Sequence, residues 1–204
     1  MKWYDYIRAP IQWLILFPLQ LALILLGFIV VPVALLFRKT DVSTSRPFTQ
    51  YPVETQWMLV TLPRWAWLWS NDLDGAMGDR RGWWNQNAPF KGGASSYLNM
   101  LCWLAFRNPA HNSMDVPRTG LSLSYVGMAY VRDRVGGSGW QFVKVSKGWR
   151  RWYGLYIVRE YANIPGRAFV VRIGFKVDPH DLYADGSLDT QIGMTYRVLP
   201  YKKL

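Results

Sequence analysis

A long run without charged residues near the N-terminus constrains this chain more than any other feature. Between Arg8 and Arg38 there is no charged side chain, and only Gln12 and Gln20 interrupt an otherwise apolar run. About 20 helical residues are enough to cross the hydrocarbon core of a bilayer, which is roughly 30 Å thick. This run is longer, and a buried helix of a soluble protein with this length and no charge would be unusual. The sequence therefore predicts a membrane anchor.

We place the anchor at residues 1–39, with a single span at about residues 11–37. Pro18 and Pro32 each remove one backbone hydrogen bond and favour a kink. Two alternatives stay open: a shorter span over about residues 19–37 that follows an interfacial helix, and a re-entrant segment with both ends on one side. A cleaved signal peptide fits less well, because its apolar region is typically about 7–15 residues long and ends at small residues, whereas this run ends in basic ones.

The charge balance bears on orientation and on partners. The chain has 24 basic and 13 acidic residues, a formal net charge of +11. Lys2 and Arg8 precede the apolar run, and Arg38, Lys39 and Arg46 follow it, so one extra positive charge favours a cytoplasmic C-terminal domain. The basic residues are scattered rather than gathered in an arm. They therefore indicate attraction to anionic lipid, the bilayer is the first expected partner, and nucleic acid is not expected.

After the anchor, residues 40–56 are polar and contain two prolines, which predicts a linker. Residues 57–204 are predicted to form one globular domain. Its first part, Trp57–Trp69, is apolar and rich in tryptophan, and it suits either an interfacial segment or a core helix. The run Tyr97–Arg107 predicts a short buried helix that ends before Pro109, because proline disfavours the helical conformation of the residue before it.

Beyond residue 120 the pattern becomes that of strands. Apolar and polar residues alternate from Phe169 to Lys176, which is typical of a strand with one buried face. Residues 121–125, 152–161 and 192–199 are also rich in alternating, aromatic or β-branched residues, and turn signals separate the runs. We therefore predict fold class α+β: an N-terminal transmembrane helix, a Trp-rich helical or irregular segment, and an antiparallel meander of about five strands.

An Asp- and Gly-rich stretch is the best candidate for a cation site. Asp72, Asp74 and Asp79 lie around Gly75 as in part of a calcium loop, whose oxygen ligands alternate about a tight glycine turn. Arg81 stands where an EF-hand has its bidentate Glu, which argues against that motif. The simpler interpretation is a glycine turn whose carboxylates bond to local backbone and arginine. No zinc-ligand spacing, nucleophile elbow or phosphate loop occurs, so no cofactor is predicted and no enzyme activity is indicated.

A second set of candidates is expected to pack or to interact rather than to catalyse. Tryptophan occurs 12 times, and its ring suits both protein cores and membrane–water interfaces. The candidates are Trp65, Trp67, Trp69, Trp103, Arg107 and Asn108. We expect the last three to organise the packing between the helical segment and the sheet.

Three motifs carry a resemblance to a known family. They are Leu62-Pro63-Arg64-Trp65-x-Trp67, Asp72-x-Asp74-Gly75-x-x-Gly78-Asp79 and Trp103-Leu104-x-x-Arg107-Asn108-Pro109-Ala110. In this order they resemble an uncharacterised family of small membrane-anchored proteins encoded by tailed bacteriophages, over roughly residues 57–176. The resemblance implies a phage origin and a location in the host inner membrane. It implies no activity and no functional residues.

Three kinds of function are compatible with these features. The first is an interaction module held at the host inner membrane, which binds a host or phage protein. The second is a membrane-acting protein of lysis or superinfection exclusion, which the segment Trp57–Trp69 suggests. The third is a lipid- or cell-wall-directed enzyme, which would need the aspartates of the Asp- and Gly-rich stretch to gather beside Arg107.

Overall fold

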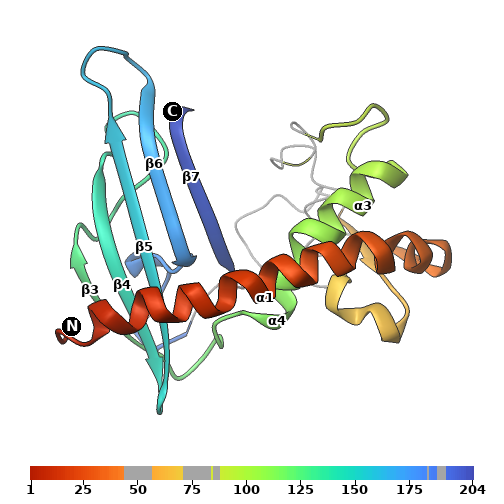
Figure 1. Cartoon of the computed structure of the whole chain (residues 1–204), viewed down its shortest axis with the longest axis horizontal. Helices are drawn as coiled ribbons and strands as arrows, with labels where there is room; N and C mark the ends of the chain where they lie inside the picture. The colour runs from red at the N-terminus through yellow and green to blue at the C-terminus, as the bar shows by residue number, and fades with distance from the viewer. Residues whose placement is uncertain (44–56, 71–83, 85–87, 183, 188–191) are drawn as a thin grey trace. The chain divides into compact units, whose positions relative to one another are not determined.

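The computed structural model describes residues 1–43, 57–70, 84, 88–182, 184–187 and 192–204 (Figure 1). This part of the chain divides into two compact units, which are described separately. The sheet unit consists of Met1–Leu19 and Met114–Leu204, and the helical unit of Gln20–Ser113. Helix α1 (Asp5–Ala34) begins in the sheet unit and ends in the helical unit. It is one uninterrupted helix, so the apolar run does not fold back on itself as a re-entrant segment.

The sheet unit contains an antiparallel meander of five strands, which confirms the predicted fold class. The strands are β3 (Ser122–Gly127), β4 (Gly139–Lys147), β5 (Arg150–Glu160), β6 (Arg167–Phe175) and β7 (Met194–Lys203). They pair in the order β3-β4-β5-β6-β7, each antiparallel to the next (Figure 1). A short 3-10 turn, η3 (Pro179–Asp181), lies between β6 and β7. Because every strand pairs with its neighbour in sequence, short turns are sufficient to build the sheet.

The turn between β4 and β5 shows how the sequence fixes the register. Lys147 pairs with Arg150, which leaves a two-residue turn of Gly148 and Trp149. Gly148 has φ of +56°, a conformation that glycine adopts without strain and that tight hairpin turns of this length require. From this turn the ladder runs to Gly139 opposite Val158.

The two faces of the sheet carry different residues. Phe142, Tyr153 and Tyr196 lie on the face that contacts α1. The opposite face carries a hydrophobic cluster that includes Tyr156, Val158 and Val170. Side chains alternate between the faces along each strand, and this explains why strands such as β5 are apolar at consecutive positions: both faces are covered.

Asp133, in the loop between β3 and β4, links that loop to two strands, β5 and β7. Its carboxylate accepts hydrogen bonds from Tyr156 Oη at 2.5 Å, Arg197 Nη1 at 3.0 Å and Lys202 Nζ at 2.6 Å. Burial alone would raise the pKa of this carboxyl, but the hydrogen bonds from Lys202 and Tyr156 outweigh burial and lower the pKa below the ordinary value of 3.8. The carboxylate is therefore charged near neutral pH and stabilises the fold in that form.

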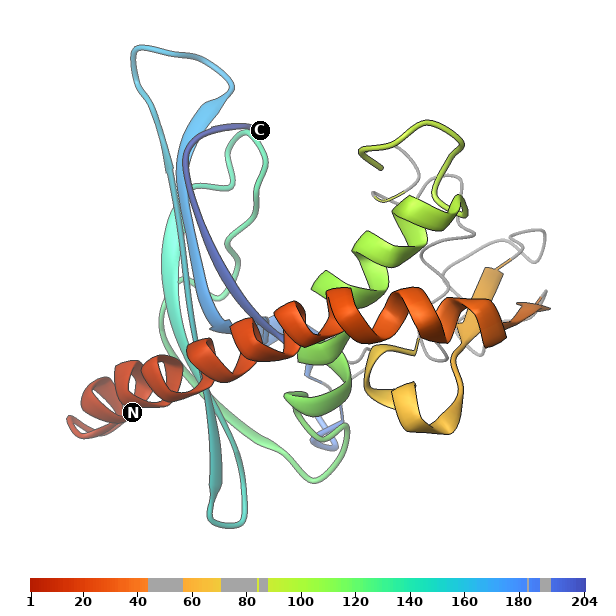
Figure 2. The same cartoon turned by 45° about the vertical axis from the view of Figure 1, so that its right-hand side comes forward.

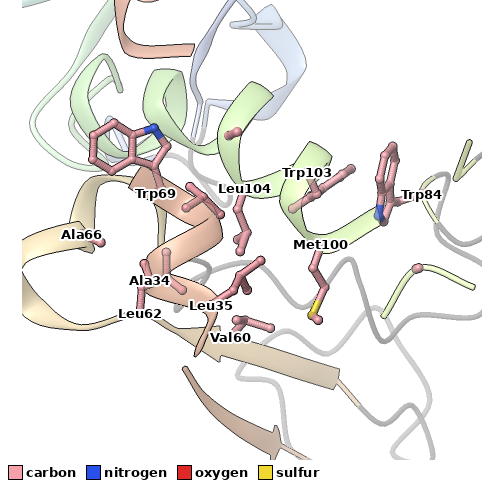
Figure 3. Packing of buried hydrophobic residues seen from close by; sticks show 13 residues of the cluster. Ala34, Leu35, Val60, Leu62, Ala66, Trp69, Trp84, Met100, Trp103 and Leu104 are labelled. Carbon is pink, nitrogen blue, oxygen red and sulfur yellow. The ribbon is translucent and has the colours of Figure 1, made fainter. Parts of the chain in front are cut away.

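The helical unit packs a hydrophobic core around the second half of α1. Its other elements are η1 (Leu35–Phe37), β1 (Lys39–Ser43), β2 (Trp57–Thr61), η2 (Arg64–Trp69), α3 (Tyr97–Phe106) and α4 (Asn108–Ser113). Leu35 from η1, Val60 from β2, and Met100 and Leu104 from α3 meet in this core (Figure 3). Strands β1 and β2 pair antiparallel as a separate two-stranded sheet.

The structure adds detail to three of the sequence predictions. The first residues of the predicted linker, 40–43, belong to β1, because they pair with β2. Helix α1 contributes to both compact units, and the division into an anchor, a linker and one domain stays a prediction. Helix α3 ends at Phe106, before Pro109 as predicted, but Asn108 is itself helical, because it begins α4. Pro109 lies in the first turn of α4, where its missing N–H costs nothing because that turn leaves N–H groups without partners.

The Asp133 network predicts a pH-dependent stability. Because the folded-state pKa of Asp133 lies below 3.8, its contribution is present above that pH and is lost as the pH falls through the folded pKa. Asp133→Asn should lower the free energy of unfolding by about 2 kcal/mol near neutral pH, since it removes hydrogen bonds from charged donors. Thermal unfolding in mild detergent, followed across pH, measures this difference, which should shrink in acid.

Asp185→Asn is the matched control for Asp133→Asn. Asp185 lies in an exposed turn and bonds only to neighbouring Ser187 among the described residues. Its substitution should leave the unfolding free energy nearly unchanged. An Asp133→Asn variant as stable as the wild type near neutral pH would contradict the proposed role of the network.

Candidate membrane-contact surface

The first half of α1 crosses one face of the sheet from β4 to β7 (Figure 2). Tyr6 stacks on Phe142 of β4 with ring centroids 5.1 Å apart. About three turns further along the helix, Phe17 contacts Tyr196 of β7 edge-on, with ring centroids 4.9 Å apart. Ala9, between them, is fully buried in a cluster with Phe142 and Tyr153. A small residue there lets the helix backbone approach the aromatic face of the sheet.

A buried ion pair holds the N-terminal end of α1 on the sheet. Asp5 Oδ2 lies 2.9 Å from Lys144 Nζ, and Asp5 Oδ1 accepts a hydrogen bond from Tyr153 Oη at 3.0 Å. The Lys2 backbone N–H also donates to this carboxylate at 2.8 Å. Burial and the hydrogen bond to Asp5 raise the pKa of Tyr153 to about 12, so its hydroxyl remains a donor. A buried charge needs such partners, because leaving one unpaired costs several kcal/mol, roughly 3–5.

Gln12 completes the hydrogen bonding of β5 where β6 has ended. The β5–β6 ladder begins at Gly154, so the backbone of Arg151 and Tyr153 lacks a partner strand on that side. The Gln12 amide fills both positions: Nε2 donates to the Arg151 carbonyl at 2.8 Å, and Oε1 accepts from the Tyr153 N–H at 3.2 Å. The side chain thus takes the place of one residue of a strand.

Trp13 adds a second polar contact at the same place. Its indole Nε1 donates to the Tyr153 carbonyl at 3.0 Å, and its own carbonyl accepts from Tyr196 Oη at 2.6 Å. Gly174 makes room for the indole, because a Cβ there would lie 2.3 Å from Trp13 Nε1 and 2.2 Å from the Tyr153 carbonyl oxygen. Gly174 also has φ of +87°. Glycine is therefore required at this position for two reasons: there is no room for a Cβ, and φ is positive.

The side of α1 that faces away from the sheet is largely apolar. Ile7, Ile11, Leu14 and Ile15 are exposed there, and Leu14 keeps 73% of its surface accessible. Of the polar residues of this half, Asp5 and Gln12 contact the sheet, whereas Arg8 is exposed near the N-terminal end. A helix on the surface of a soluble domain shows the reverse arrangement, with its polar side outward.

The second half of α1 repeats this arrangement within the helical unit. Gly27 and Val31 are buried, and the Trp69 indole donates to the Leu23 carbonyl at 3.2 Å. A Cβ at Gly27 would lie 2.6 Å from the Trp69 Nε1 atom, so glycine again admits a tryptophan to the backbone. On the exposed side the residues are apolar, and Ile29 is 71% accessible. The exposed positions of this half are Leu21, Leu25, Leu26, Phe28, Ile29 and Val33.

Both halves of α1 thus expose apolar side chains. The helix is apolar and long enough to span a membrane, and most of its apolar surface is exposed. Exposed apolar surface this extensive marks a site of interaction with a membrane or another protein.

The predicted tryptophans separate into two groups. Trp69 is buried in the core of the helical unit, whereas Trp65 and Trp67 of η2 are exposed, Trp67 by 57%. Trp57–Trp69 is thus neither a core helix nor one interfacial segment: β2 and η2 each turn part of it inward. Trp103 lies in the core beside Trp84, with the ring centroids of the two tryptophans 5.0 Å apart (Figure 3). The Arg107 guanidinium lies 4.3 Å from the ring centroid of Trp103.

The remaining predicted sites cannot be placed. Asp72, Asp74 and Asp79 lie outside the described residues, and so does the side chain of Asn108. Within the described residues, no group of three or more His, Cys, Asp or Glu side chains is arranged to hold a metal ion.

The residues that attach α1 were not singled out from the sequence, although a signal for them exists. Asp5, Gln12 and Gln20 are the polar residues of α1 besides Arg8. They are seven and eight residues apart, which is close to two helical turns. Spacing of this kind places polar groups on one side of an apolar helix and predicts that this side contacts protein.

The fold and this surface define a class of protein: a small α+β protein whose sheet is built onto an apolar N-terminal helix. The chain belongs to a family of unknown function, DUF7338, whose model matches residues 5–204. The match includes α1 together with the sheet, so the helix belongs to what the family shares. No curated protein and no solved structure matches the chain. The resemblance to phage proteins stays a prediction.

The edge contacts of Gln12 predict the effect of its substitution. Gln12→Leu should lower the free energy of unfolding by about 1–3 kcal/mol, because it leaves a backbone carbonyl and an N–H without partners. The Tyr153 amide hydrogen should also exchange faster with solvent. Unfolding in mild detergent and hydrogen–deuterium exchange measure the two effects.

Ile11→Leu is the matched control, since it changes the neighbouring residue on the exposed side of α1. It should preserve both the stability and the exchange rate. If Gln12→Leu, which increases hydrophobicity, proves as stable as the wild type, then apolar contacts rather than these hydrogen bonds hold the helix on the sheet.

Proposed function

We propose that this protein is a membrane-associated binding module. In this proposal α1 contacts the bilayer, and the sheet unit presents a surface to a host or phage protein. One observation carries the proposal: Asp5 and Gln12 of α1 bond to the sheet, whereas the exposed side of the helix is apolar apart from Arg8 near its N-terminal end. A lipid environment is the one in which this arrangement is favourable.

The energetics of membrane binding support this role. Burying an aliphatic side chain completely contributes roughly 1.5–3 kcal/mol. The exposed side of the first half of α1 alone offers Ile7, Ile11, Leu14 and Ile15. Basic residues add roughly 1 kcal/mol each near an anionic surface, and the net charge of +11 provides many of them. Together these contributions are sufficient for stable attachment.

The helix would have to remain attached for this function. Removal of residues 1–19 as part of a leader would delete Asp5, Gln12 and Trp13, and with them the hydrogen bonds to Tyr153 and Arg151. The family match, which includes α1, also favours a helix that is kept.

The resemblance to phage proteins favours the host inner membrane as the location. The positive flank after α1 favours the cytoplasmic side for the sheet unit. We propose both on these grounds. A partner could add a strand to the sheet at β3 or β7, which form its two edges.

Flotation with lipid vesicles tests membrane binding. The purified protein should float with phosphatidylcholine vesicles and more strongly when phosphatidylglycerol is included, and raised salt should reduce the difference. The double substitution Leu14→Gln and Ile15→Gln should weaken binding at least about tenfold, which corresponds to roughly 1.4 kcal/mol.

Val135→Gln is the control for flotation, because Val135 is also exposed but lies in the loop between β3 and β4. It should float like the wild type. Wild-type protein that stays at the bottom of the gradient with both kinds of vesicle would refute the proposal.

A second candidate function is disturbance of the membrane, as in lysis or superinfection exclusion. The exposed indoles of Trp65 and Trp67 favour it. Under this alternative, expression in bacteria depolarises the inner membrane, and the substitutions Trp65→Ser and Trp67→Ser abolish the effect. Trp69 is left intact, because it is buried and its loss would damage the fold.

Phe90→Ser is the control for this test, since Phe90 is an exposed aromatic residue of the same unit. It should leave depolarisation unchanged. A potential-sensitive dye gives the measurement, and a wild-type protein that causes no depolarisation rules the second candidate out.

A further inference from the structure

We infer that α1 lies in the plane of the membrane surface and does not cross the bilayer. The inference rests on the proposed membrane association and concerns the manner of binding. It replaces the single span expected from the sequence with a helix that exposes one side to lipid while its other side contacts protein.

The first step is the position of the N-terminal end of α1. Asp5 bonds to Lys144 Nζ and Tyr153 Oη, at 2.9 and 3.0 Å. Lys144 lies in β4 and Tyr153 in β5. The start of the helix and the sheet must therefore lie on the same side of any membrane.

The second step follows the chain from the other end of α1 to the sheet. If α1 crossed the bilayer, the residues after Phe37 would emerge on the opposite side from Asp5. The chain would then need a second crossing before Ser122, where the first strand of the sheet begins. Without it, the sheet could not reach Asp5.

No segment between Arg38 and Ser122 is suited to a second crossing. The longest stretch without charge runs over residues 92–106, which is 15 residues, and it opens with Gly-Gly-Ala-Ser-Ser. Its helical part, α3, has 10 residues. A helix of that length spans about 15 Å, half of the roughly 30 Å hydrocarbon core. A complete crossing by α1 is thus incompatible with the contacts of Asp5.

The third step is the width of the lipid-facing surface. A helix that crosses a bilayer alone is surrounded by lipid. Here Ala9 is fully buried against the sheet in the first half of α1, and Val31 is fully buried within the helical unit in the second. Only one side of each half is available to lipid. Interfacial helices insert their apolar side about 5–10 Å and turn a polar side away from the hydrocarbon. In α1 the packed protein takes the place of that polar side.

Residues around the N-terminal end of α1 suit the headgroup region. Trp3 and Tyr6 are exposed, and Lys2 and Arg8 lie beside them. Tryptophan and tyrosine favour the boundary between hydrocarbon and water, and lysine and arginine pair with anionic headgroups. A charged end of this kind is placed at a membrane surface more readily than it is carried through a bilayer.

Cysteine labelling tests the topology. Single cysteines are introduced in a Cys102→Ala background. Lys2→Cys and Lys39→Cys report the two ends of α1, and Lys203→Cys reports the end of the sheet. All three lysine side chains are exposed. A membrane-impermeant maleimide is applied to spheroplasts and, separately, to inverted inner-membrane vesicles. An in-plane helix gives labelling of all three positions in the same preparation. Labelling of positions 2 and 39 in opposite preparations overturns the inference.

Depth measurements give an independent test. Nitroxide labels at Ile7, Leu14, Leu25 and Ile29 are compared in phosphatidylcholine–phosphatidylglycerol vesicles, using collision with oxygen and with a water-soluble nickel chelate. An in-plane helix gives similar, shallow depths at all four positions. A spanning helix gives depths that increase toward its middle, which overturns the inference. Ala9, which faces the sheet, serves as the protein-facing control and should be poorly accessible to both quenchers.

These tests separate failure of the inference from failure of the proposed function. Protein that does not float with vesicles refutes membrane association, and the topology question then does not arise. Protein that floats, but whose helix ends are labelled in opposite preparations, refutes only the in-plane arrangement. Leu14 and Ile15 would in that case still contact lipid, as the proposed function requires.

Discussion

The contact between the start of α1 and the sheet determines most of what this chain can do. Asp5 pairs with Lys144 and Tyr153, and Gln12 bonds to the open edge of β5. These contacts are made away from the exposed apolar side and fix the rotation of the helix about its own axis. Once that rotation is set, the identity of every exposed residue on the first half of α1 is set too. The apolar surface is thus a consequence of polar contacts beneath it.

The same contact explains why so apolar a helix is compatible with a sheet of ordinary composition. The apolar side chains of such a helix offer a sheet little that is directional, because dispersion and hydrophobic contacts do not select one orientation. Two amide hydrogen bonds, an indole hydrogen bond and an ion pair supply the missing direction. Gly174 and Gly27 contribute because they have no side chain. At each position a tryptophan ring approaches the backbone, which a methyl group would prevent.

The sequence predicts some of these features and not others, for physical reasons. The alternation from Phe169 to Lys176 identified strand β6, because period two is a local property of the chain. It did not identify which side is buried, since Val170, on the side predicted to be solvated, is fully buried. The apolar run identified α1 but not its orientation, since nearly every residue in it is apolar and the pattern has little directional signal. The role of Gln12 could not be predicted either, because it depends on where the ladder between β5 and β6 ends. Asp72, Asp74 and Asp79 lie outside the described residues, and their prediction stands as it was made.

The contacts of α1 with the sheet join residues that are very far apart along the chain. Gln12 and Arg151 are separated by 139 positions, and Trp13 and Tyr196 by 183. During synthesis the helix leaves the ribosome long before any strand that covers it exists. Its apolar surface must meanwhile be held by a chaperone or by the bilayer itself, because exposed apolar segments of nascent chains aggregate. If the protein associates with a membrane as proposed, translation close to that membrane would bring the helix to it before the sheet is synthesised.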